Sequence, residues 1–315
     1  MLARKFSYIV RDPRNMNRLL SLIIRIEFLR DLITRVFRIF KPSVWPVELD
    51  QEAMRHYQEI TKIGYSELPR LSAQQLSDIH NHLKYKALYV RFMHGKGASY
   101  THDAIPQGIN MLEYDSLTVA QCPYLLELAN SKLYIDIAQK ILGCRPTISS
   151  LNVWYSNHRA ASPKDTELFH RDFDDWRFIK VIVYLVDVDE DTGPHVYVEQ
   201  SHLSTKLKWR YRYTDSAVEK AFADKIIKLT GPAGSSFMIN TYGMHKGLRP
   251  TQRSRLVLQV VYSMNRTPNG PARPVISLPR GFDPYLNRIY CSAEEQTARS
   301  PHASVRRARP SAADI

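Results

Sequence analysis

The stretch Phe169-His170-Arg171-Asp172 decides how this sequence folds and what its site contains. Met244-His245, farther along the chain, supplies a second histidine that can complete the site. On a strand, residues i and i+2 point to the same side, so His170 and Asp172 can present their side chains together. His245, on a facing strand, would add a second imidazole. Two imidazoles and one carboxylate can hold one face of an Fe(II) ion and leave positions open for co-substrate and dioxygen, which is the facial triad of non-haem iron oxygenases.

A lone His-x-Asp often occurs as a solvated surface pair, so the prediction depends on the sequence around it. Residues 178–186 form an apolar run rich in β-branched residues, which is typical of a buried strand. The polar run 187–194 predicts a turn. By the same patterns we predict further strands at residues 150–155, 195–199, 237–240 and 256–262. The strand at 237–240 would deliver His245 to the site, and Arg255 would open the last strand.

With these segments in place, the chain resembles the phytanoyl-CoA dioxygenase-like family of Fe(II)/2-oxoglutarate oxygenases. The resemblance covers roughly residues 59–264. In chain order, its motifs are residues 63–69, the His170-Arg171-Asp172 region, residues 185–194, residues 243–250 and Arg255. The chain departs from the family at Glu199-Gln200-Ser201-His202, where many members have Pro-Gly-Ser-His, but no metal ligand lies in that loop.

The resemblance implies an α+β, mainly β fold: a double-stranded β-helix (jelly roll) flanked by helices. It also implies iron held by His170, Asp172 and His245, with 2-oxoglutarate as co-substrate and O2 as oxidant. The reaction would be hydroxylation of a substrate with release of succinate and CO2. Related halogenating enzymes have a small residue in place of the carboxylate, so Asp172 favours hydroxylation over chlorination. The family's substrates are diverse, and the resemblance does not name one.

Arg255 is the leading candidate for the cation that holds the far carboxylate of 2-oxoglutarate. It stands ten residues after His245 at the start of an apolar strand, and a buried guanidinium requires an anion. Lys180 competes for this role if its side chain points inward, and the sequence leaves the choice open. Asn152 and Tyr155 on the early strand could hydrogen-bond the co-substrate, although no spacing rule requires it.

Three parts of the chain differ in composition. We predict a basic amphipathic helical extension at residues 1–45 and an oxygenase domain at residues 46–280. A Pro/Arg-rich tail that is partly disordered would follow at residues 281–315. Within the domain, a mostly helical part at 50–145 precedes the β core at 148–264.

The basic residues are concentrated at the two ends of the chain. Residues 1–45 hold ten Lys and Arg against three Asp and Glu, and residues 265–315 hold eight against four. The whole chain has 44 Lys and Arg and 31 Asp and Glu, so residues 46–264 hold twenty-six basic residues against twenty-four acidic ones. A nearly neutral middle disfavours nucleic acid as a partner, whereas the basic ends suggest contact with an anionic surface.

Residues 18–40 repeat apolar side chains at helical spacing, with arginines largely on the other side. This helix would pack on the protein's own core, pack on a second copy in an oligomer, or lie on an anionic membrane. The first residues lack the apolar core of a secretory signal. Three widely spaced cysteines match neither a disulfide framework nor a zinc site. We therefore expect a cytoplasmic protein, with peripheral contact at the inner face of the membrane as an option.

A basic and aromatic segment, residues 206–213, opens an insertion whose later part, 216–228, is predicted to be helical. We expect this segment at the mouth of the barrel, where it would select an anionic or amphiphilic substrate. A solvated loop is the alternative. The candidate substrate contacts are Trp209, Arg210, Tyr211 and Arg212, and the expected substrate is a small molecule, an acyl compound or a lipid-linked compound.

Two other functions remain open from the sequence. A nucleic-acid demethylase would use the same iron chemistry, but the nearly neutral middle of the chain counts against it. A catalytically silent jelly roll would bind a ligand or partner, but the intact triad with Arg255 counts against that. His80 and His82 do not predict a second metal site, because residues i and i+2 do not share a helix face.

Overall fold

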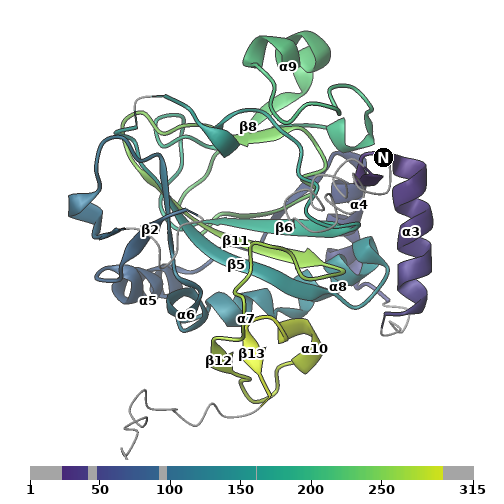
Figure 1. Ribbon diagram of the computed structural model, residues 1–315, viewed down its shortest axis with the longest axis horizontal. Coiled ribbons are helices and arrows are strands. Elements are labelled where there is room, and N and C mark those ends of the chain that lie inside the picture. The colour runs from purple at the N-terminus through teal and green to yellow at the C-terminus, as the bar shows by residue number, and fades with distance from the viewer. Residues whose placement is uncertain (1–22, 42–47, 92–97, 161, 294–315) are drawn as a thin grey trace, which may run out of the picture.

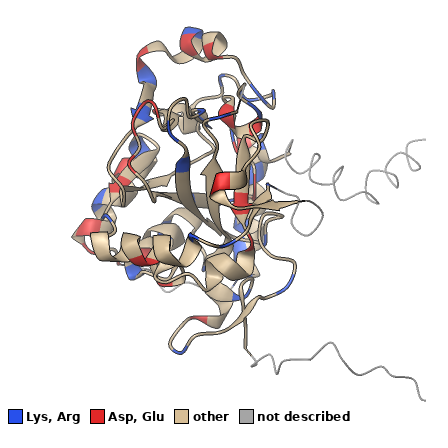
Figure 2. Ribbon diagram, turned by 90° about the vertical axis from the view of Figure 1, so that its left-hand side faces the viewer, with Lys and Arg blue, Asp and Glu red and all other residues tan. Residues whose placement is uncertain are grey.

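The computed structural model describes residues 23–41, 48–91, 98–160 and 162–293. An antiparallel sheet of eight strands lies opposite a smaller sheet of three strands (Figure 1). Helices cover the outer face of the large sheet. In the ribbon, basic and acidic residues are interspersed rather than gathered on one face (Figure 2).

Three long strands form the centre of the large sheet: β5 (Thr147–Ser156), β6 (Phe178–Tyr184) and β11 (Arg255–Ser263). β11 pairs antiparallel with both of its neighbours, so that Gln259 lies between Asn152 and Ile182. The strands predicted from these runs are confirmed. The sheet order is β1-β9-β6-β11-β5-β4-β2-β3, and its shorter strands are β1 (Tyr65–Leu68), β2 (Leu88–Val90), β3 (Ser99–Tyr100), β4 (Met111–Tyr114) and β9 (Ser236–Ile239).

The small sheet has the order β10-β7-β8, with β7 (His195–Val198), β8 (Ile226–Leu229) and β10 (His245–Gly247). His170 extends it through an isolated antiparallel bridge to His245, in which each backbone N–H donates to the other's carbonyl at 2.9 Å. Two expectations need correction here. Asp172 lies in the loop after the bridge, not on a strand, and its N–H donates to the Thr241 carbonyl. The strand predicted at 237–240 is β9 of the large sheet, whereas His245 opens β10 of the small one.

The helices before the core pack on the large sheet. They are α4 (Gln51–Lys62), α5 (Ala73–Leu83), α6 (Ser116–Ala120), α7 (Leu125–Ala129) and α8 (Lys132–Leu142). Ser72 caps α5 in a capping box with Gln75. Leu151, Val181 and Leu258 are completely buried beneath the helices, and each such side chain contributes roughly 1.5–3 kcal/mol to folding. Helices are the main regular structure of residues 50–145, as expected, and the short strands β1 to β4 between them were not predicted.

Helix α3 (Glu27–Ile39) docks on the protein through its polar side. Arg38 donates to the Leu142 carbonyl at 2.6 and 3.0 Å, Asp31 pairs with Arg177 at 2.8 Å, and Glu27 pairs with Lys208 at 2.8 Å. Its large apolar side chains that are 48% to 79% exposed are Phe28, Leu32, Val36 and Ile39, together with Phe40 just past its end. The expectation that the apolar face packs on the protein's own core holds for Ile24, which is buried with Phe178, and for Phe37, which stacks on Trp176, but not for these exposed side chains. Residues 18–22 of the predicted helix lie outside the described residues.

The chain after the core strands folds back onto them. β12 (Ile276–Ser277) pairs with β13 (Cys291–Ser292), and α10 (Pro284–Asn287) lies between them in sequence. Tyr290 is completely buried, and its hydroxyl accepts the Leu151 N–H at 2.6 Å. The folded part thus extends past the boundary predicted at residue 280, and the rest of the predicted tail, residues 294–315, lies outside the described residues.

The remaining elements are short. α9 (Asp215–Phe222) confirms a helix in the insertion. The 3₁₀ turns are η1 (His102–Ala104), η2 (Asp165–Glu167), η3 (Ser201–Leu203) and η4 (Ala223–Lys225). Cys122, Cys144 and Cys291 are buried free thiols. A search of the described helices finds none with the length and apolar character needed to cross a bilayer.

Candidate metal and co-substrate site

A cavity of about 920 Å³ lies between the two sheets. This volume is at the upper end of the range for small-molecule sites, so the cavity can hold a co-substrate and a second molecule. The large sheet lines it with Trp154, Ser156, Lys180, Ile182, Tyr184, Arg255, Val257 and Gln259. Facing them are His170, Asp172, His195, His245 and Gly247.

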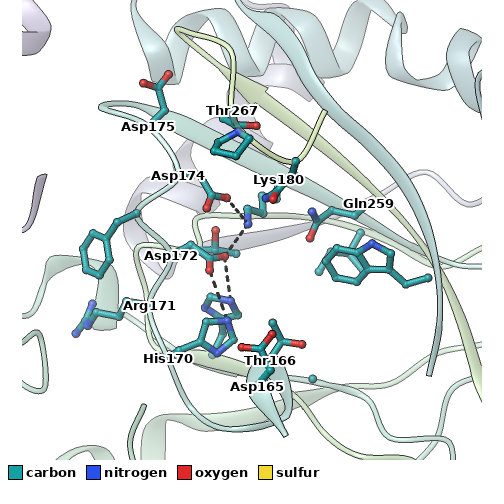
Figure 3. A pocket seen from close by; sticks show the side chains of 18 of the residues that line it. Asp165, Thr166, His170, Arg171, Asp172, Asp174, Asp175, Lys180, Gln259 and Thr267 are labelled. Carbon is teal, nitrogen blue, oxygen red and sulfur yellow. Dashed lines mark hydrogen bonds and ion pairs between the residues drawn. The ribbon is translucent and has the colours of Figure 1, made fainter. Parts of the chain in front are cut away.

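His170, Asp172 and His245 converge in this cavity (Figure 3). The His170 Nε2 lies 3.5 Å from the Asp172 Oδ1, and the His245 Nε2 lies 3.2 Å from the Asp172 Oδ2. One donor atom from each of the three residues lies within 4.8 Å of the others. Ligands about 2.1 Å from a common octahedral ion lie about 3 Å apart, so this spacing fits a metal ion after small adjustments.

Backbone carbonyls fix the orientation of both imidazoles. The Nδ1–H of His170 donates to the Leu168 carbonyl at 2.8 Å, and that of His245 donates to the Gly243 carbonyl at 2.9 Å. A carbonyl only accepts, so each Nε2 carries the lone pair and faces Asp172. Burial, reinforced by the adjacent His245, lowers the pKa of His170 to about 3. This keeps the ring neutral, as metal coordination requires.

Lys180 points into the cavity and is paired with two carboxylates. Its Nζ lies 2.7 Å from the Asp172 Oδ2 and 2.7 Å from the Asp174 Oδ2. Burial would raise the pKa of Asp172, but the Lys180 ammonium and His245 outweigh burial and hold that pKa well below its usual value. Asp172 is therefore ionised, and the charge of Lys180 is balanced without a bound anion.

Arg255 is buried without a counter-ion among the described residues. Its side chain is 5% exposed, and its hydrogen bonds, to the Leu248 carbonyl and the Ser156 hydroxyl, are both 3.4 Å long. Its Nε has no hydrogen-bond partner in the part of the chain that the structure describes. A Cβ on Gly247 would lie 2.9 Å from the Arg255 Nη2, so glycine makes room for the guanidinium. Because a buried, unpaired guanidinium is costly, the donor set and its surroundings fit a carboxylate ligand here.

The other predicted co-substrate contacts do not line the cavity. Asn152 shares the strand face of Trp154, but its side chain accepts a hydrogen bond from Ser150 farther down the strand. Tyr155 points to the opposite face, where its ring lies edge-on to His102 with centroids 4.9 Å apart.

Of the predicted substrate contacts, Tyr211 and Arg212 line the cavity. Arg212 also forms an ion pair with Asp165 in the turn opposite. Trp209 and Arg210 are exposed and do not line the cavity. Two of the four predicted substrate contacts, Tyr211 and Arg212, therefore lie where a substrate in the cavity could reach them.

His195 is a cavity residue that the sequence reasoning did not identify. Its ring stacks on that of His245 with centroids 5.3 Å apart, and the residue is 7% exposed. Among the residues that the structure describes, its Nε2 has no hydrogen-bond partner. Burial and the adjacent His245 lower its pKa well below the usual value, so it is neutral. Gln259 and Tyr184 were also missed. Strand alternation could have found them, because they follow Arg255 and Lys180 at even spacing.

Comparison with known proteins adds evidence on the fold. No protein-family model matches the chain, and no curated protein matches its sequence. Solved structures do match. The epimerase SnoN in complex with Fe³⁺, α-ketoglutarate and nogalamycin RO is 19% identical, with a TM-score of 0.50 over 77% of this chain and 96% of that chain. The two proteins share a fold. The chain thus has a mixed helix-and-sheet architecture consistent with the predicted jelly roll.

Two further structures are similar to a lesser degree. EctD from S. alaskensis with 2-oxoglutarate and 5-hydroxyectoine is 19% identical, with a TM-score of 0.48 over 80% of this chain and 88% of that chain. HygX from Streptomyces hygroscopicus with nickel, 2-oxoglutarate and hygromycin B is 13% identical, with a TM-score of 0.47 over 77% and 96%. The phytanoyl-CoA dioxygenase-like family itself stays a prediction.

Proposed function

We propose that this protein is an Fe(II)/2-oxoglutarate-dependent oxygenase that hydroxylates a small-molecule, acyl or lipid-linked substrate, with release of succinate and CO2. The observation that carries the proposal is that one cavity holds both the triad and Arg255, a buried cation with no carboxylate partner among the described residues. Crystallisation of SnoN with Fe³⁺ and α-ketoglutarate on the same fold is consistent with this function.

Each proposed role follows from a described contact. His170, Asp172 and His245 would hold the metal through atoms that already face one another. When bound, Fe(II) would supply the activation of dioxygen that couples decarboxylation of 2-oxoglutarate to oxidation of the substrate. Arg255 would grip the far carboxylate of 2-oxoglutarate with two parallel hydrogen bonds.

Apolar neighbours would strengthen the grip of Arg255. Ile182 and Val257 line the cavity from adjacent strands and are each 6% exposed. Apolar lining would reduce the water around a bound carboxylate, and a charge pair is stronger where the local dielectric is low. The retained carboxylate of Asp172 supports hydroxylation rather than halogenation. A silent binding protein would not require three metal donors with fixed orientation.

The exposed face of α3 supports a peripheral membrane location as a further part of the proposal. Phe28, Leu32 and Ile39 face outward, and the first 45 residues carry ten Lys and Arg against three Asp and Glu. An apolar stripe within a basic segment is suited to an anionic bilayer surface. The proposed location is the cytoplasmic face of a membrane, where a lipid-linked substrate would be within reach.

Succinate release tests the proposed reaction. Full-length protein is incubated with Fe(II), 2-oxoglutarate and O2, alone and with a panel of metabolites, beside His170→Ala. The proposal predicts succinate from the unchanged protein, stimulated by the substrate, and none above background from the variant. Equal succinate from both proteins would show that the triad is not responsible.

A further inference from the structure

Most cavity-lining cations have partners that account for their charge or their donors. Lys180 is paired with Asp172 and Asp174, and Arg212 is paired with Asp165. Arg171 donates to five backbone carbonyls, those of Ser201, Ser204, Lys206, Leu207 and Tyr242. Arg255 is assigned above to the co-substrate. Arg91 donates to the Thr166 hydroxyl and lies over the Trp154 ring, and Arg266 donates to the Pro271 carbonyl. The remaining cation of the lining is Arg25, which the segment just before α3 brings into the cavity.

Arg25 is buried with little to satisfy it. Its side chain is 2% exposed, its Nη1 donates to the Lys208 carbonyl at 2.7 Å, and its Nε has no hydrogen-bond partner within the described ranges. No described carboxylate lies within ion-pair distance of it. Burial lowers its pKa, but a guanidinium remains charged at neutral pH. As with Arg255, a buried cation in this state is suited to an anionic ligand.

Two aromatic rings flank this guanidinium. The Arg25 Cζ lies 4.5 Å from the centroid of the Phe173 ring and 5.6 Å from that of Tyr211. Such contacts fix the plane of the guanidinium while leaving its N–H edge free to hydrogen-bond. Phe173 follows Asp172 directly in the chain, so this cluster lies beside the metal ligands. All three side chains line the same cavity as the triad.

We propose that Arg25, Phe173 and Tyr211 form a subsite for the carboxylate or phosphate of an amphiphilic organic anion, which is the substrate to be oxidised. The inference rests on the proposed function and names the substrate class of that site. The anion contacts Arg25, and the apolar body of the substrate packs on the two rings. The N-terminal segment therefore supplies part of the active site, beyond any role at a surface.

Fluorescence titration with matched aromatic probes tests this subsite. Full-length protein loaded with Ni(II) and saturating 2-oxoglutarate, which fills the Arg255 position, is titrated with 2-naphthoate, 2-naphthyl phosphate and neutral 2-naphthamide. The variant is Arg25→Gln, and the matched control is Arg35→Gln, an exposed arginine of α3 that lines no part of the cavity. We expect Arg25→Gln to weaken binding of the preferred anion about 10-fold or more and to leave the amide unchanged. Arg35→Gln should bind all three probes normally.

The two anions also distinguish the chemistry of the substrate, because the tighter of them identifies a carboxylate or a phosphate group. Equal affinity of both anions for Arg25→Gln and the unchanged protein would overturn the subsite, as would failure of both anions to bind the unchanged protein. Arg25→Lys keeps the charge but loses the planar fork, so an intermediate loss is expected. If Arg25→Gln does not fold, Arg25→Lys and Phe173→Leu carry the test, and unchanged anion affinity in both would overturn the subsite.

Failure of the proposed function would be seen separately. Were 2-oxoglutarate not to bind the Ni(II)-loaded protein, the proposed co-substrate would be wrong. The same probe titration of metal-free protein would still test whether Arg25 binds an organic anion.

Discussion

The Lys180 Nζ lies 2.7 Å from the Asp172 Oδ2, the same oxygen that lies 3.2 Å from the His245 Nε2. The lysine therefore neutralises the carboxylate of the triad. From the sequence alone, Lys180 and Arg255 competed for the far carboxylate of 2-oxoglutarate. The charge balance favours Arg255, because Lys180 already faces two carboxylates and Arg255 faces none among the described residues.

Lys180→Met should destabilise the metal-free protein by about 3–5 kcal/mol, because it leaves Asp172 and Asp174 without their cation. A divalent ion would replace the lost positive charge, so Ni(II) should raise the unfolding temperature of this variant more than that of the unchanged protein. Lys208→Met removes another buried lysine, paired with the more exposed Glu27 away from the triad, and serves as the control. Equal Ni(II) stabilisation of all three proteins would contradict the proposed charge balance.

Asp172→Ala and His245→Ala should each reduce iron affinity by at least about 100-fold, since loss of an outer-shell partner alone typically costs 10–100-fold. Asp174→Ala is the matched control, because Asp174 also contacts Lys180 but is not one of the three convergent donors. Metal content after anaerobic dialysis against Fe(II) measures the effect. Unchanged iron content in both triad variants would show that Asp172 and His245 are not ligands of the metal.

Arg255→Ala should weaken 2-oxoglutarate binding by about 2–5 kcal/mol, which is a loss of roughly 30-fold or more. The control is Arg253→Ala, since Arg253 is an exposed residue paired with Asp189. Calorimetry on Ni(II)-loaded protein compares the affinities. If Arg255→Ala binds normally while Lys180→Met does not, Lys180 is the anchor instead.

The double variant Phe28→Ser and Leu32→Ser should lose binding to phosphatidylserine vesicles. Each removed side chain contributes roughly 1.5–3 kcal/mol when it is buried in the bilayer, so a loss of at least 10-fold is expected. Leu203→Ser, which changes an exposed leucine elsewhere, should bind normally. Cosedimentation measures binding, with phosphatidylcholine vesicles as the neutral comparison. If the unchanged protein does not bind phosphatidylserine vesicles and the two substitutions change the oligomeric state of the protein, the exposed face of α3 belongs to a protein interface.

The sequence predicted the parts of the fold that are encoded locally. Long runs of β-branched and apolar residues identified β5, β6 and β11, because both faces of these strands are buried. The convergence of His170, Asp172 and His245 was predicted correctly from their types and from the segments around them. Strands β1 to β4 were missed because they are short and of mixed polarity, so only their partners in the sheet define them.

The site was predicted less completely than the fold, because residues far apart in the sequence meet in the cavity. Arg25 reaches the cavity through the docking of α3, which local pattern does not encode. The direction of α3 was also unpredictable, because an amphipathic pattern normally places its apolar face inward, whereas Arg38 and Asp31 make the contacts here. Tyr155 was placed in the site although its neighbour Trp154 faces the cavity, an error of one residue that reverses the side of a strand.

Metal-dependent binding of 2-oxoglutarate tests the central claim most directly, because it needs no knowledge of the substrate to be oxidised. Under anaerobic conditions, 2-oxoglutarate is titrated calorimetrically into full-length protein with Fe(II), into the same protein without metal, and into Fe(II)-treated His245→Ala. We expect saturable binding to the Fe(II)-loaded protein and binding at least about 10-fold weaker in the other two. No binding to the Fe(II)-loaded protein, or equal binding in all three, would contradict the assignment of this cavity as an iron and 2-oxoglutarate site.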